Sequence, residues 1–434
     1  MIIFGAGSSV PFDIPGMMGF TEAFKHSIKN DTEISVFVEG IEDAISQTGD
    51  IIGISLSFDL ETLLSVLTDL SGATNEKPIS IPTASLLLKQ GLKINEARKK
   101  YQDKASSTLK ELRDYVFKKC MRPIKEGKKE GSFQFLDKFY GPLMTVLNKT
   151  DLKNIQPSII SIYSTNWDLC FKTWADYVNI PINDGTDLDS QSFPVLNVGK
   201  FERTSNGFNY APLHGSLDLI KIDRPKGGGA YKDIFKISDP VRYFEDKPDN
   251  IKDVFTIYPL EAIGYEESIK SPYLDMLHNF RRSLESEGII FVIGYSLRDP
   301  TIGSLFEEVI AKRIRSGDIL PSSLDIDDRK IKARTDRLKI IVIDSNPKKL
   351  EENLKKQSRP NLLSTFIPIT VEFPKITDPD FDEKTTNAMA KIIADLKELD
   401  YLQESHINEI RGVLSNRYGI FVDERTRALL KEKS

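Results

Sequence analysis

The most continuous apolar runs of the chain are short and lie far apart in the sequence. Residues 288–294 and 338–344 consist mainly of aliphatic residues, with little polar alternation. Runs of this kind are typical of strands that are buried on both faces of a sheet. The β-rich runs 1–4, 158–165 and 366–373 predict further strands, of which the first is the shortest. The pattern therefore predicts a sheet of mainly buried strands.

Between these runs, the apolar positions recur at helical spacing. Residues 18–150 predict an almost entirely helical segment between the first strand and the second, including one long helical tract over 82–120. Asp299-Pro300 follows a strand and is typical of a helix start. The C-terminal tail predicts two charged helices. Strands that alternate with helices favour an α/β fold with a doubly wound parallel sheet, a large helical insertion after the first strand, and C-terminal helices.

The composition argues against several classes of protein. The chain has 434 residues, a hydrophobic content of 40% and a formal net charge of −5, so no overall basic field directs it to nucleic acid. Cys120 and Cys170 are its two cysteines, too few for a four-cysteine zinc site and typical of a reducing compartment. No apolar run reaches the roughly 20 residues of a membrane span, and Met1 leads directly into a strand without a signal peptide. We therefore expect a cytoplasmic protein that binds no metal and does not associate with a membrane.

The first predicted strand runs into Gly5-Ala6-Gly7-Ser8. Glycines in such a turn let the backbone approach a phosphate, and the amides that follow can face an anion. The third glycine of the dinucleotide-binding fingerprint is absent, because Val10 stands in its place. From this stretch alone, a phosphate site and an ordinary glycine turn remain alternatives.

Polar residues also follow the other predicted strands. Ligands of open α/β sheets bind beyond the carboxyl ends of the strands, so these residues are candidates for a common site. They are small, hydroxyl or amide residues with one histidine among them, which suits a polyhydroxylated, phosphorylated ligand: Ser8, Ser9, Thr165, Asn166, Asp168, His214, Gly215, Ser216, Gly294, Ser296, Asp299, Asp344, Ser345 and Asn346. Asn166 and Asp168 fit a plain helix cap equally well, and a lone histidine such as His214 is more often a core or surface residue.

Five short motifs, in this order and spacing, resemble the sirtuin-like domains of bacterial anti-phage proteins. They are Gly5-Ala6-Gly7-Ser8-Ser9, Ile14-Pro15-Gly16, Ser164-Thr165-Asn166-Trp167-Asp168, Leu213-His214-Gly215-Ser216 and Ile293-Gly294-Tyr295-Ser296-Leu297-Arg298-Asp299-Pro300. The resemblance extends from residue 1 to about residue 347. It implies a Rossmann-like NAD-binding domain over 1–17 and 151–375, with 18–150 as a helical insertion and 376–434 as a C-terminal helical tail.

The resemblance also implies roles for individual residues. Gly5, Ala6, Gly7 and Ser8 would hold the pyrophosphate, with Thr165 beside them. Asn166 would hold the nicotinamide ribose and a water molecule, Asp168 would lie near the carboxamide, and His214 would act as the base. Gly294, Ser296 and Asn346 would line the adenosine side.

The chain departs from true sirtuin deacetylases in two respects. It lacks their zinc module of two Cys-x-x-Cys pairs, and Gly16-Met17-Met18 stands where they carry Asp-Phe-Arg. What remains is cleavage of the bond between nicotinamide and ribose with water as the acceptor, through an oxocarbenium-like transition state. The resemblance therefore predicts an NAD hydrolase that depletes NAD in anti-phage defence.

Two alternatives remain open. The chain could be a binding subunit that senses NAD or a nucleotide, or a nucleic-acid effector that uses the basic stretch 93–129, although such a stretch is more often a solvated helix face. An unregulated NAD hydrolase would kill its host, so we expect control by assembly or by a partner. The helical insertion, the charged terminal helices and the lack of an obvious sensor domain predict a homo-oligomer, and the resemblance implies a HerA-type ATPase as its partner.

Overall fold

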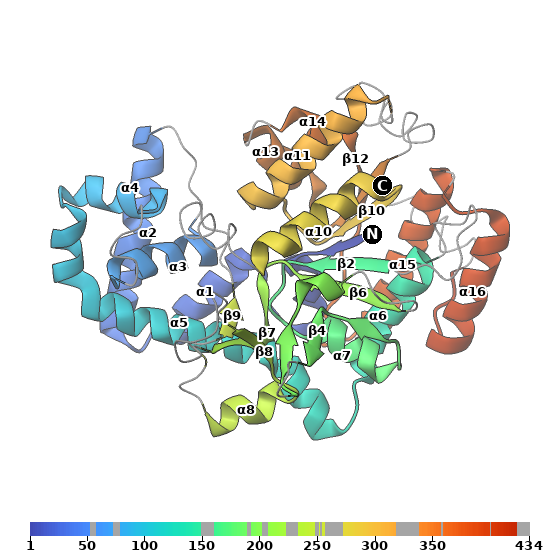
Figure 1. Cartoon of the computed structure of the whole chain (residues 1–434), viewed down its shortest axis with the longest axis horizontal. Helices are drawn as coiled ribbons and strands as arrows, with labels where there is room; N and C mark the ends of the chain where they lie inside the picture. The colour runs from blue at the N-terminus through green and yellow to red at the C-terminus, as the bar shows by residue number, and fades with distance from the viewer. Residues whose placement is uncertain are drawn as a thin grey trace. The chain divides into compact units, whose positions relative to one another are not determined.

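A seven-stranded sheet forms the centre of the computed structural model, and each of its strand pairs is parallel. Its order is β12-β11-β10-β1-β2-β6-β3, and Figure 1 shows these strands among the helices. The strands are β1 (Ile2–Phe4), β2 (Ile160–Ser164), β3 (Ile182–Asn183), β6 (Phe208–Pro212), β10 (Ile289–Ile293), β11 (Lys339–Asp344) and β12 (Phe366–Thr370). The predicted α/β class with a parallel sheet is confirmed.

The chain divides into two compact units. The first, called the sheet unit here, contains Met1–Ile14, Pro123–Leu213 and Asp275–Ser434, and the second unit contains Pro15–Arg122 and His214–Leu274. The C-terminal helices and the segment after Arg122 belong to the sheet unit. The structure describes residues 1–52, 58–72, 79–148, 160–188, 192–201, 207–222, 233–247, 251, 254–256, 272–317, 338–356, 359–399 and 401–422.

Helices cover both faces of the sheet. Tyr163 on β2 packs against Phe280 of α10 with ring centroids 4.9 Å apart, whereas Phe4 on β1 packs against Phe171 of α7 at 5.2 Å. Ile3 is the register partner of Tyr163, and successive strand residues point to opposite faces, so α10 and α7 lie on opposite faces. The helical elements of the sheet unit are η1 (Ala6–Phe12), α6 (Gln134–Leu147), α7 (Cys170–Tyr177), η2 (Val198–Lys200), α10 (Tyr273–Ser286), α11 (Pro300–Arg315), α13 (Pro347–Lys356), α14 (Pro360–Thr365), α15 (Phe381–Glu398) and α16 (Glu404–Tyr418), with an antiparallel pair β4 (Thr186–Leu188) and β5 (Pro194–Leu196).

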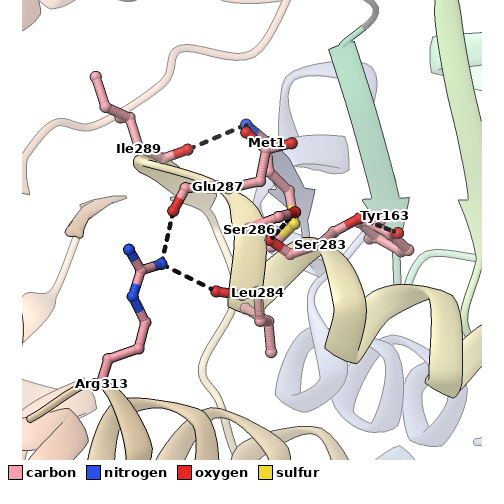
Figure 2. A network of polar contacts seen from close by, with 8 residues as sticks. All are labelled: Met1, Tyr163, Ser283, Leu284, Ser286, Glu287, Ile289 and Arg313. Atoms are coloured by element: carbon pink, nitrogen blue, oxygen red, sulfur yellow. Dashed lines mark hydrogen bonds and ion pairs between the residues drawn. The ribbon is translucent and has the colours of Figure 1, made fainter. Parts of the chain in front are cut away.

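Polar contacts fix α10 and α11 beside the sheet, as Figure 2 shows. The buried guanidinium of Arg313 on α11 donates to the Leu284 and Glu287 carbonyls at 3.4 and 2.8 Å, and so satisfies acceptors at the end of α10. The Tyr163 hydroxyl lies 2.8 Å from the Ser283 hydroxyl on the same helix. These bonds hold β2, β10 and the two helices in one arrangement.

The second unit is mainly helical. Its elements are α1 (Met17–Ser27), α2 (Thr32–Ile52), α3 (Leu60–Leu70), α4 (Ile81–Gln90), α5 (Ile94–Glu130, which continues into the sheet unit), β7 (Gly215–Ile222), β8 (Asp233–Lys236), α8 (Pro240–Asp246) and β9 (Val254–Thr256). The single long helix predicted over 82–120 is wrong, because Gly91 adopts a left-handed conformation with φ of 63° and ends α4. Within the described ranges, no helix is long and apolar enough to cross a membrane.

Candidate functional site

The turn after β1 packs directly against the turn after β10. The Gly5 and Gly7 amides donate to the carbonyls of Ile293 and Gly294 at 2.9 and 2.8 Å. A Cβ on Gly5 would lie 2.5 Å from the Tyr295 Cα, and one on Gly7 would lie 2.7 Å from the Gly294 Cα. Gly294 itself has φ of 59°. These glycines are therefore required because two backbones meet at the carboxyl edge of the sheet.

This packing determines which amides of the turn remain for a ligand. Gly5, Gly7 and Ser8 use their N–H groups within the protein, the last toward the Gly5 carbonyl at 2.9 Å. The Ala6 N–H, at the start of η1, donates to no residue that the structure describes. An anion at this turn would therefore find the Ala6 amide rather than a series of free amides.

Asn166, just beyond β2, connects to this turn through its side chain. Its Nδ2 lies 3.0 Å from the Gly5 carbonyl oxygen, 3.1 Å from Ser8 Oγ and 2.8 Å from Ser9 Oγ. Both serine hydroxyls donate elsewhere, Ser8 to the Gly5 carbonyl at 2.8 Å and Ser9 to Asp168 Oδ2 at 2.6 Å. The hydroxyl oxygens must therefore accept from Asn166, which fixes the orientation of its amide.

The oxygen of the same side-chain amide, Asn166 Oδ1, is buried and accepts no hydrogen bond from the residues described. Its position is set by the backbone, because the Thr165 amide donates to the Phe4 carbonyl at 3.0 Å and the Asn166 amide donates to Ser164 Oγ at 3.1 Å. Buried polar atoms normally have a partner, so one that lacks it marks a point where a ligand or water can bind.

Asp168 holds this arrangement in place through its hydrogen bond from Ser9. It is 6% exposed, and its two carboxylate oxygens accept from the Cys170 amide at 3.0 Å and from the Ser9 hydroxyl. Burial raises the pKa of Asp168, and the hydrogen bond from Ser9 opposes this shift. Its contacts make Asp168 a positioning residue for Ser9 and, through Ser9, for Asn166.

The remaining predicted residues lie at neighbouring places. Ser296 follows β10, and its hydroxyl accepts from Arg298 Nε at 3.3 Å. Asn346 follows β11, is exposed, and donates its amide to Asp344 Oδ1 at 2.7 Å. His214 is 2% exposed and begins the second segment of the second unit, which also contains Gly215 and Ser216, whereas the other predicted site residues belong to the sheet unit.

Ser9 is the residue that sequence reasoning left without a role. Ser9 is 1% exposed, and its hydroxyl joins Asn166 to Asp168. Ser9 and Asp168 are 159 residues apart in the chain. Its only sequence signal was a second serine after Gly-Ala-Gly, at the end of a predicted strand.

Comparison with known proteins gives no family. No protein-family model matches the sequence, and no curated protein matches it. In the part of the chain that is described, no three His, Cys, Asp or Glu side chains converge to hold a metal ion. The geometry around Asn166 is therefore the main ground for a functional proposal.

Proposed function

We propose that the chain is an NAD hydrolase that cleaves the bond between nicotinamide and ribose. The observation that carries the proposal is Asn166, whose amide nitrogen is held by the Gly5–Ser9 turn while its buried Oδ1 remains available. A carboxamide oxygen fixed in this way suits a water molecule or a ribose hydroxyl. Orientation of the attacking water is the main task of such an enzyme.

The strand order supports a Rossmann-like dinucleotide site. With the two-residue β3 left aside, the strands in chain order are β1, β2, β6, β10, β11 and β12, so the sheet order becomes 3-2-1-4-5-6. This is the order of doubly wound dinucleotide-binding sheets, in which the ligand lies where the order reverses. Here the reversal falls between β1 and β10, beside the two packed turns.

In the proposed reaction, the carbon–nitrogen bond to nicotinamide breaks as water adds to the same ribose carbon, and the water's proton passes to a base. The Ala6 amide would contact the diphosphate, with Gly294, Ser296 and Asn346 on the adenosine side. Asn166 would orient the water or the ribose hydroxyl, and His214 would be the base. The Ser9–Asp168 pair would keep Asn166 from rotating.

One observation favours a binding subunit as the second candidate. The Asn166 cluster consists of Gly5, Ser8, Ser9, Asn166 and Asp168, and Asp168 is its acidic residue. Both carboxylate oxygens of Asp168 accept hydrogen bonds from protein donors, so it is no free base. A module that senses NAD or a nucleotide would need no base at all. The nucleic-acid alternative gains no support from α5, because acidic Asp103, Glu111 and Glu126 are exposed among its lysines.

The biological context of the proposal is anti-phage defence by NAD depletion, in a homo-oligomer controlled by a HerA-type ATPase. This part rests on the resemblance of the motifs alone. Light scattering in dilute buffer tests the assembly, and a monomer unaffected by any ATPase would contradict it.

The function is tested by measuring nicotinamide release from NAD. Asn166→Ala and His214→Ala should each reduce the rate on the order of 100-fold or more, as loss of a preorganised polar group commonly does. Asn408→Ala is the matched control, since Asn408 is exposed on α16. If the protein binds NAD without releasing nicotinamide, the binding subunit is the correct alternative. Release at the parental rate by both site variants would refute the site.

A further inference from the structure

A cavity of about 600 Å³ lies at the carboxyl end of β12, away from the Asn166 side chain's contacts. Its walls come from η1, from the segment after β12 and from α15, all within the sheet unit. Its volume is in the range of small-molecule sites, which is about 300–1,000 Å³. The lining residues that matter here are Val10, Phe373, Lys375, Lys384, Asn387 and Lys391.

One wall of the cavity is a polar stripe. Lys384, Asn387 and Lys391 follow one another at helical spacing, so they share one face of α15. Lys375 adds a third ammonium group from the segment after β12, against the two carboxylates of Glu372 and Asp378. Within the lining, three ammonium groups face two carboxylates, and the aspartates that pair with the lysines add negative charge beside it.

The ammonium groups are accessible. The side chains of Lys375, Lys384 and Lys391 are 53, 48 and 41% exposed, and each is paired with an aspartate. The Lys384–Asp380 pair is 48% exposed on both sides and such pairs contribute little free energy, whereas Asp13 and Asp395, the partners of Lys375 and Lys391, are 22 and 18% exposed. An incoming phosphate would compete with these carboxylates for the ammonium groups.

The other wall is apolar. Val10, Val371, Phe373, Pro374 and Ala388 line it. The Phe373 ring is held edge-on against Phe139, with centroids 5.1 Å apart, so its position is fixed by packing. A fixed aromatic ring beside aliphatic side chains suits a planar heterocycle.

We infer that this cavity binds a nucleoside monophosphate, with the phosphate on Lys384 and Lys391 and the base against Phe373 and Val10. This site is separate from the Asn166 cluster, and its occupancy does not depend on the proposed hydrolysis. It does share an element with that cluster, because Val10 follows Ser9 in η1 and the Ile376 amide donates to the Pro11 carbonyl at 2.8 Å. A nucleotide in the cavity would therefore contact the same short helix that holds Asn166.

The test uses the full chain and AMP as the probe. Isothermal titration should show binding that weakens at least tenfold in the double variant Lys384→Gln/Lys391→Gln, and further in Lys384→Glu/Lys391→Glu. Adenosine, which lacks the phosphate, should bind at least tenfold more weakly than AMP. Lys397→Gln should bind AMP as the parent does, because Lys397 is a paired lysine of the same helix that does not line the cavity. Thermal unfolding of each variant controls for loss of fold.

Photolabelling with azido-AMP locates the site independently of any substitution. Labels should fall on peptides that contain Phe373 or Asn387, and Asn166→Ala should leave them unchanged. Labels confined to the segments after β2 or β10 would overturn the inference, and so would the absence of AMP binding. Equal affinity of the parent and the Lys384/Lys391 variants would overturn it as well.

Discussion

Ser9→Ala tests the physical basis of the Asn166 cluster. The substitution removes the 2.6 Å hydrogen bond to Asp168 Oδ2 and one of the three acceptors of Asn166 Nδ2. Ser9 is 1% exposed and Asp168 is 6% exposed, so water cannot readily replace the lost donor. The bond from the Cys170 amide to Asp168 Oδ1 remains. A hydrogen bond to a charged group contributes about 1.5–3 kcal/mol, and we expect a loss of free energy of unfolding of about 2 kcal/mol.

Urea unfolding monitored by tryptophan fluorescence is the assay. The two tryptophans of the chain, Trp167 and Trp174, are both buried in the sheet unit, so their signal reports the unit that contains Ser9. Thr385→Val is the matched control, since Thr385 is buried on α15 in the same unit and its hydroxyl has no partner among the described residues. We expect that control to cost little or nothing. If Ser9→Ala costs no more than Thr385→Val, the Ser9–Asp168 bond does not stabilise the site.

Three further predictions concern stability. Burial raises the pKa of Asp168 above its ordinary value of 3.8, so between these two pH values the folded state holds a proton that the unfolded state has lost. The contribution of Asp168 to the free energy of unfolding should therefore be full below pH 3.8 and be lost as the pH rises through the raised pKa. Urea midpoints across acidic pH should show this loss in the parent and less of it in Asp168→Asn. Gly7→Ala should destabilise the protein by about 1–3 kcal/mol, because the added Cβ would lie 2.7 Å from the Gly294 Cα. Gly412 on α16 has open space around it, so Gly412→Ala should be neutral or stabilise the protein by up to about 1 kcal/mol in the same urea assay. Burial raises the pKa of Tyr418 from 10.0 to about 12, so the free energy of unfolding should fall between these two pH values, and it should fall less in Tyr418→Phe. An ultraviolet titration in which Tyr418 ionises near pH 10 would contradict this.

The sheet could be predicted from the sequence because its strands are signalled locally. β10 and β11 are continuous apolar runs, and their ends coincide with the predicted ends to within about one residue. The break at Gly91 was missed because apolar spacing continues on both sides of it. Periodicity cannot distinguish one long helix from two that follow in register.

The candidate site was only partly predictable, because its physical causes are contacts between distant segments. Gly5 and Gly7 attracted attention as a phosphate turn, but their lack of a Cβ is explained by the backbone at Gly294, which no local pattern indicates. The pairing of Ser9 with Asp168 joins residues that are 159 positions apart. Residue types at strand ends were sufficient to nominate Asn166 and Asp168, and only the fold distinguished the available amide oxygen from the occupied carboxylate.

The most direct test of the central claim is incubation of the protein with NAD in water enriched in heavy oxygen, alone and with the proposed HerA-type ATPase, followed by mass spectrometry of the products. Water as the acceptor requires one heavy oxygen atom in each ADP-ribose released, with nicotinamide in equal amount, and Asn166→Ala should release both products on the order of 100-fold more slowly. NAD recovered intact under both conditions would contradict the account, as would ADP-ribose that contains no heavy oxygen.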